Sequence, residues 1–102
     1  MQQDENYFFV KLSPPRPTFF FDMTDDERNV MKEHGVYWDT LVQSKRVLLF
    51  GPVIDPKGPY GMGVFEVKDI EKVWELITND PVKKANLGTY EVYPMKIGTI
   101  CK

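Results

Sequence analysis

The chain has 102 residues, 42% hydrophobic and 27% charged, which are the proportions of one globular domain, and we expect a single domain over residues 1–102. A formal net charge of -2 argues against nucleic-acid binding, which normally needs a basic stripe. No apolar run approaches the ~20 residues that cross a bilayer, so no membrane partner is expected. The single cysteine, Cys101, excludes an internal disulfide and indicates a cytoplasmic protein.

The first half of the chain is expected to hold two strands and one long helix. In order, we expect a strand at 7–12, a proline-rich connection at 13–17, a loop at 18–23, a helix from Thr24 to about Ser44, and a strand at 47–50 before Gly51-Pro52. The helix start is the clearest of these signals. Thr24 and Glu27 have the spacing of a capping box, in which each side chain satisfies a free backbone N–H group.

The second half is expected to hold two strands and one helix, separated by turn segments. In order, we expect a turn at 53–60, a strand at 62–67, a helix from Asp69 to Asn79, a connection at 83–88, and a strand at 89–93 that Pro94 ends. The apolar face of this helix is expected to consist of Ile70, Val73, Trp74 and Ile77.

The order of elements predicts an α+β fold, a ferredoxin-like βαββαβ sandwich whose four-stranded antiparallel sheet carries two helices on one face. A sheet with one solvated face should alternate apolar and polar residues, but Tyr7–Val10 and Val47–Phe50 are apolar throughout. The second face should therefore also be covered. We expect a homodimer with its sheets packed face to face, and segment 19–21 is the alternative cover.

His34, the only histidine, has apolar neighbours at helical spacing and should point inward from its helix. A buried imidazole needs a hydrogen-bond partner, and a carboxylate would fix its tautomer. Asp55 and Asp80 are the main candidates because each precedes a proline that holds the backbone extended. Asp22 and Asp39 are weaker candidates. The alternative is that His34 is structural and hydrogen-bonded to a backbone carbonyl or to Tyr37, Tyr60 or Tyr90. In that case the aspartates are turn or cap residues.

General acid–base catalysis by His34 is the chemistry that remains once the other catalytic motifs are excluded. The sequence holds no nucleophile elbow, phosphate loop or paired-cysteine metal motif. Gly58, Gly61 and Gly63 follow a proline turn rather than opening a helix, so they are not a dinucleotide fingerprint. Because the chain has one histidine and one cysteine, which is near the terminus, we expect no metal and no cofactor. The alternative is a metal site formed by His34 and carboxylates.

The order of these segments resembles the YciI-like (YCII-related) family. The resemblance spans about residues 7–96, and the order and spacing of its segments are more specific than any one of them. The segments that carry it are the histidine helix Met31–Trp38, the strand Val47–Val53 with its Gly-Pro, Asp80-Pro81-Val82 followed by Gly88, and the closing strand Glu91–Met95.

The resemblance implies a dimeric α/β barrel and a pocket centred on a histidine–aspartate pair proposed as acid–base machinery. By position the pair is His34 and Asp80, and Asp55 is a weaker match because its loop varies. The loop at 16–19 and the turn at 58–61 look like those of a subgroup. Activities of the wider superfamily include dehydrochlorination of hydroxylated aromatics and isomerisation of lactones, and the residues assign neither here.

Two functions are therefore open. The first is a cofactor-free lyase or isomerase for a small organic molecule, aromatic ones included, with His34 as general base and Asp80 orienting it. Arg16 would hold an anionic group, and aromatic side chains would line the pocket: Phe19, Phe20, Phe21, Trp38 and Tyr60. The second is a noncatalytic ligand-binding or dimerisation module with the same pocket. RNA binding is disfavoured because the acidic chain lacks the Lys/Arg-Gly-aromatic signature.

Overall fold

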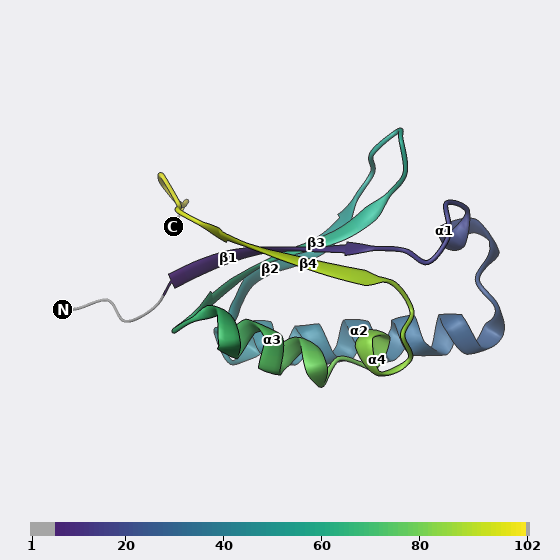
Figure 1. Ribbon diagram of the computed structural model, residues 1–102, viewed down its shortest axis with the longest axis horizontal. Coiled ribbons are helices and arrows are strands. Elements are labelled where there is room, and N and C mark those ends of the chain that lie inside the picture. Colours follow the sequence, from purple (N-terminus) through teal and green to yellow (C-terminus); the bar gives the residue numbers. More distant parts are fainter. Residues whose placement is uncertain (1–5, 102) are drawn as a thin grey trace.

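A computed structural model describes residues 6–101 and contains one four-stranded antiparallel sheet. The strands lie in the order β2-β3-β1-β4. The elements are β1 (Asn6–Ser13), α1 (Phe19–Asp22), α2 (Asp25–Gln43), β2 (Val47–Val53), β3 (Tyr60–Val67), α3 (Ile70–Thr78), α4 (Pro81–Lys84) and β4 (Thr89–Met95). In Figure 1, α2, α3 and α4 all lie below the sheet. This arrangement confirms the ferredoxin-like α+β fold predicted from the sequence.

The core lies between the sheet and helices α2 and α3. Alternate residues of the strands point into it, because successive strand side chains face opposite ways. The strands contribute Phe8, Val10, Val47, Phe65 and Val67, and the helices contribute Trp38, Leu41, Val73, Leu76 and Ile77. Each such side chain contributes roughly 1.5–3 kcal/mol on burial, so this layer is the main source of stability. Trp74, expected in this layer, is instead 38% exposed.

Helix α2 begins as the capping-box spacing predicts. The Glu27 N–H donates to Thr24 Oγ1 at 3.1 Å, and the Thr24 N–H donates to Glu27 Oε1 at 2.9 Å. Asp69 caps α3 in a similar way by accepting from the Lys72 N–H at 3.0 Å. These caps fix where each helix starts and therefore which side chains face the sheet.

Two single-turn helices and two strand prolines differ from the sequence expectation. Helix α1 lies in the segment expected to be a loop, and α4 precedes the connection to the last strand. Each has four residues, too few for an apolar period to be visible. Pro52 and Pro94 lie inside β2 and β4 instead of ending them. Both are edge strands, where a missing N–H need not break the ladder.

The second face of the sheet carries no helix within residues 6–101 (Figure 1). One apolar row crosses all four strands on this face: Leu49, Val64, Phe9 and Tyr93. The Phe9 and Tyr93 rings stack with their centres 6.4 Å apart. Leu49 is 52% exposed and Tyr93 is 48% exposed. Segment 19–21 does not cover the row, because buried Phe19 lies on the helix side, in a cavity lining shared with Trp38 of α2.

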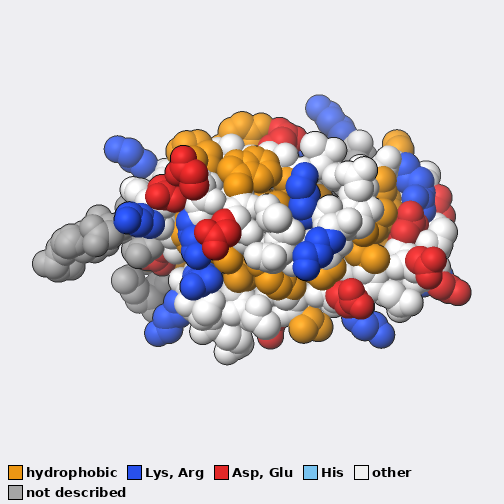
Figure 2. Space-filling model, turned by 60° about the horizontal axis from the view of Figure 1, so that its bottom comes forward, with side chains coloured by type: hydrophobic (Ala, Val, Ile, Leu, Met, Phe, Trp, Pro, Cys, Tyr) orange, Lys and Arg blue, Asp and Glu red, His pale blue; other side chains and the backbone are white. Residues whose placement is uncertain are grey.

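Charged side chains of both signs are interspersed over the face that Figure 2 shows, on the helix side of the molecule. Hydrophobic side chains appear between them in small groups. None of the helices in the described part of the chain is long and apolar enough to span a bilayer.

Candidate functional site

The fold brings the side chains of His34, from the middle of α2, and Asp80, just before α4, into contact. The His34 Nδ1 atom lies 2.9 Å from Asp80 Oδ2 and 3.0 Å from Oδ1. Asp80 is fully buried, whereas the His34 side chain is 15% exposed. An ionised carboxylate can only accept hydrogen bonds, so Nδ1 carries the hydrogen of the neutral ring. The other ring nitrogen, Nε2, then keeps a free lone pair.

Three further donors hold the Asp80 carboxylate. The Trp38 Nε1–H donates to Oδ2 at 2.7 Å, and the Tyr90 hydroxyl donates to the same oxygen. The backbone N–H of Val82 donates to Oδ1 at 2.9 Å. Burial by itself raises the pKa of Asp80, but the hydrogen bonds from these side chains and the contact with His34 outweigh burial and hold the pKa below its ordinary value. The carboxylate is therefore charged at neutral pH.

The local sequence explains why Asp80 points at His34. Asp80 has an extended backbone and is the N-cap of α4, with Pro81 at the first helical position. The bond from the Val82 N–H is the cap, and it leaves the rest of the carboxylate facing α2. The structure therefore combines two interpretations that the sequence set against each other, a cap aspartate and a histidine partner.

Trp38 reaches Asp80 because Gly63 of β3 has no side chain. A Cβ atom at Gly63 would overlap the Trp38 ring. The indole is also held by Phe65 and Phe50, whose ring centres lie 5.2 and 5.6 Å from it. The glycine thus fixes the direction of the indole N–H, a role that a sequence reading cannot separate from a strand-start glycine.

A cavity of about 210 Å³ opens beside the His34–Asp80 pair. It lies between α1, α2 and the sheet, and its lining is Val10, Leu12, Pro14, Phe19, Phe20, Met31, His34, Trp38, Phe50, Gly51, Pro52, Gly61, Met62, Leu87 and Tyr90. None of these lining residues is an Asp, Glu, Lys or Arg. The Trp38 and Tyr90 donors are both taken by Asp80, and His34 is the one basic side chain of this lining.

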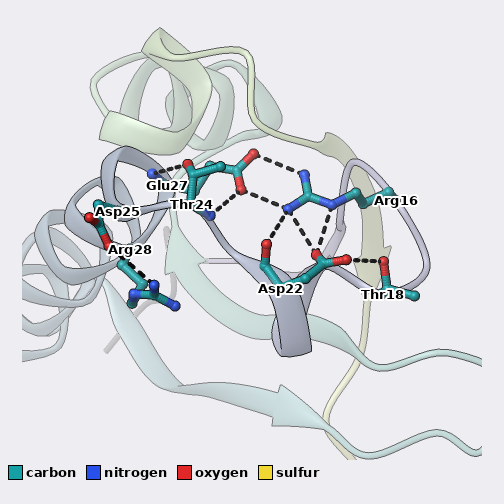
Figure 3. Close-up of polar contacts among 7 residues, drawn as sticks. All are labelled: Arg16, Thr18, Asp22, Thr24, Asp25, Glu27 and Arg28. Atoms are coloured by element: carbon teal, nitrogen blue, oxygen red, sulfur yellow. Dashed lines mark hydrogen bonds and ion pairs between the residues drawn. The ribbon is translucent and has the colours of Figure 1, made fainter.

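Arg16, expected to hold an anionic group, is instead bound within the protein (Figure 3). Its guanidinium donates to both Glu27 oxygens at 2.8 and 2.9 Å and to Asp22 Oδ1 at 2.9 Å. The hydrogen bond from Arg16, followed by that from the Thr24 backbone, lowers the pKa of Glu27 to about 2. The guanidinium also lies 5.3 Å from the centre of the Phe19 ring. Arg16 therefore ties α1, and with it Phe19, to the start of α2.

Three other predicted site residues lie outside the cavity lining. The Asp55 carboxylate accepts from the Lys57 N–H at 2.9 Å in the β2–β3 turn, which is turn chemistry rather than a histidine contact. The Lys11 ammonium nitrogen lies over the Tyr60 ring, 4.6 Å from its centre. Phe21 is 84% exposed, because in the one-turn helix α1 it faces away from buried Phe19. Phe19 and Trp38, by contrast, both line the cavity.

Tyr90 is the site residue whose role the sequence did not reveal. It was a candidate partner for His34, but its hydroxyl binds Asp80. Its position in β4 carries a signal: Tyr90 pairs with Leu12 and Val92 pairs with Val10, so both face the helices. That direction could be predicted only with knowledge of how β4 pairs with β1.

Within residues 6–101, no group of three or more His, Cys, Asp or Glu side chains is placed to hold a metal ion.

Comparisons with known proteins agree with this fold. The solved structure of 5-chloro-2-hydroxyhydroquinone dehydrochlorinase from Burkholderia phenoliruptrix AC1100, in complex with 2,5-dihydroxybenzoquinone, is similar at a TM-score of 0.65 and 21% identity. The match covers 89% of this chain and 95% of the dehydrochlorinase chain. A search of curated proteins found no match. Residues 7–97 match the YCII-related domain, and the chain therefore belongs to the YCII-related domain family.

Proposed function

We propose that the protein is a cofactor-free acid–base enzyme of lyase or isomerase type, in which His34 is the general base and Asp80 orients it. The observation that carries this proposal is the contact of a buried, charged Asp80 with His34 at the wall of an apolar cavity. Such a pair resembles the base–orienter arrangement of many acid–base enzymes. The similar fold of a dehydrochlorinase adds support by analogy.

The geometry supports a specific first step. With its hydrogen on Nδ1, the imidazole presents the Nε2 lone pair to a bound molecule and takes a proton from its carbon or hydroxyl group. The new imidazolium is stabilised by the Asp80 charge 2.9 Å away. In one course, the electron pair left by the proton forms a double bond as a leaving group departs with its own electron pair. In the other, the electron pair shifts along the molecule and the imidazolium returns the proton to another carbon. The first course is a lyase reaction and the second is an isomerisation.

The wall of the cavity limits the class of molecule. A volume of about 210 Å³ is small beside the ~300–1,000 Å³ typical of ligand pockets. The lining offers no Lys or Arg for a phosphate or a carboxylate, and Arg16 is occupied by Glu27 and Asp22. We therefore propose a compact, uncharged organic molecule with one acidic proton near His34, and aromatic molecules suit the many ring contacts.

The test is a screen of small neutral phenols, chlorinated hydroxyquinols and lactones as substrates. Product formation is measured by NMR, and dehydrochlorination is measured by the release of chloride. Any turnover should fall at least ~100-fold in His34→Gln, the lower end of a general-base contribution. Asp80→Asn should lose activity while still binding the molecule. Full turnover by folded His34→Gln would overturn the proposal.

A noncatalytic ligand-binding module is the second candidate, and one observation favours it. The same carboxylate that meets His34 also caps α4 and accepts from Trp38, so the pair ties two helices to the core. In that case His34→Gln would lower thermal stability strongly and leave ligand binding intact. Under the enzymatic proposal, stability would stay near the wild-type value or rise, since functional residues are often not optimal for stability.

We also propose that the protein is a homodimer through the open sheet face. The row of Leu49, Val64, Phe9 and Tyr93 places apolar side chains of all four strands on one surface. Half-exposed Leu49 and Tyr93 would lose contact with water when a second sheet packs on this row. A twofold arrangement places the same row on both copies, which makes the surface self-complementary.

A further inference from the structure

Tyr90 is a partly buried titratable group that the proposed chemistry does not use directly. Its hydroxyl donates to Asp80 Oδ2, the oxygen that also accepts from Trp38 and lies 2.9 Å from His34 Nδ1. Burial first, and then the Asp80 charge, raise the pKa of Tyr90 well above its ordinary value. Tyr90 therefore stays a neutral donor throughout the pH range in which histidine titrates.

We infer that Tyr90 is a positioning residue for His34: its hydroxyl shares the Asp80 charge and so sets how strongly Asp80 holds a proton on the imidazole. A carboxylate that gives part of its charge to one donor has less to give to another. The side chains that bind Asp80 directly are His34 and Trp38 from α2 and Tyr90 from β4. Tyr37 of α2 interacts with Asp80 only through space, and its hydroxyl donates to the Leu76 carbonyl at 2.6 Å.

The consequence concerns proton transfer. If Asp80 were bound by His34 alone, it would hold the proton on the imidazole tightly and make His34 slow to release it. With Tyr90 and Trp38 on the same carboxylate, the pair is weaker and the imidazole can both accept and return a proton. The catalytic meaning of this inference rests on the proposed function. The electrostatic part does not, and it can be tested without any substrate.

The test is an NMR titration of the His34 ring in the wild type, Tyr90→Phe and the control Tyr37→Phe. Because the chain has one histidine, its ring signals need no separate assignment. Tyr90→Phe should move the His34 titration midpoint upward, by less than the effect of a whole neighbouring charge. Tyr37→Phe, which removes a hydroxyl that Asp80 does not bind, should leave the midpoint in place. An unchanged or lowered midpoint in Tyr90→Phe would overturn the inference.

A second measurement applies if Tyr90→Phe does not fold. Uniform labelling with 3-fluorotyrosine keeps every hydroxyl but makes each phenol a stronger donor. The His34 midpoint should then move downward, opposite to the effect of removing the hydroxyl, and should move equally in the Tyr37→Phe background. No movement, or movement that disappears in Tyr37→Phe, would overturn the role of Tyr90. Loss of activity in His34→Gln tests the proposed enzyme function separately, so the two can fail independently.

Discussion

Trp38 and Asp80 lie 42 positions apart in the chain, and the indole N–H donates to the aspartate at 2.7 Å. This bond joins α2 to the residue before α4 within the packed core. It holds Oδ2 of the carboxylate, while the helix-capping bond from the Val82 N–H holds Oδ1. Asp80 therefore has its direction fixed before His34 is considered, which is the condition for a residue that orients a base.

Asp80→Asn should destabilise the protein at neutral pH by about 2–4 kcal/mol, because it removes the charge from a buried network of donors. A lowered pKa means that this charge stabilises the fold above the unfolded value of ~3.9 and that the stabilisation is lost as pH falls through the folded value. The difference in stability between wild type and Asp80→Asn should therefore be largest above about pH 4 and should shrink as the pH falls below it. Urea unfolding at pH 7, 5 and 3 measures the difference.

The matched control for this series is Asp55→Asn. Asp55 also precedes a proline, but its carboxylate accepts from one backbone N–H in a turn, a bond that asparagine keeps. Its stability should stay within about 0.5 kcal/mol of the wild type at each pH. A constant difference between wild type and Asp80→Asn from pH 7 to pH 3 would contradict a charged Asp80.

Gly63→Ala should destabilise the protein by about 1–3 kcal/mol, because the added methyl group collides with the Trp38 ring and forces the core to shift. Displacing the indole also weakens its bond to Asp80, so the Trp38 indole N–H signal should move in NMR spectra. Gly51→Ala, at a position where a Cβ atom meets nothing within 4 Å, is the control. Equal effects at the two glycines would argue against the close approach of Trp38 to β3.

Arg16→Gln should loosen α1 and admit solvent to the cavity, because the guanidinium joins Asp22 to Glu27 (Figure 3) and also lies against Phe19. Acrylamide quenching of Trp38, measured in a Trp74→Phe background, should rise by about twofold as the segment opens. Arg28→Gln removes an exposed pair with Asp25 at 3.2 Å and should leave quenching unchanged. Equal quenching in both arginine variants would show that Arg16 does not hold the cavity wall.

Leu49→Lys should convert the proposed dimer to a monomer, because it places a charge in the apolar row on the open sheet face, at the end of the row that lies on β2. Val36→Lys is the control: Val36 is 64% exposed but lies on α2, on the helix side. Light scattering coupled to gel filtration measures the mass of each variant. A monomeric wild type, or a Leu49→Lys variant that remains dimeric, would contradict the sheet-to-sheet interface.

The sequence predicts the order of the strands and long helices because each has a complete signal. Thr24 and Glu27 mark a helix start, and apolar runs such as 47–50 mark strands. It misses α1 and α4 because a single turn of helix is too short to show an apolar period: α4 is held by its Asp80 cap, and α1, which has no side-chain cap bond, is held by the packing of Phe19. It ends strands at Pro52 and Pro94 because an edge position is known only after the strand order is known.

The candidate site is predicted less completely. Asp80 and Asp55 have the same Asp-Pro sequence, and only the fold shows that one faces α2 while the other faces its own turn. Phe19 and Phe21 are likewise equivalent in sequence, and the helical geometry of α1 separates them by about 200° around its axis. Arg16 looks available until Glu27 and Asp22 are placed beside it. Each of these distinctions depends on contacts between distant segments.

The His34–Asp80 pair is examined most directly by an NMR titration of His34 in the wild type and in Asp80→Asn. A charged Asp80 at 2.9 Å from Nδ1 stabilises the imidazolium, so the midpoint should lie higher in the wild type than in the variant. Removing the carboxylate charge while keeping its shape isolates this interaction. Identical midpoints in two folded proteins would contradict the His34–Asp80 pair as the centre of the site.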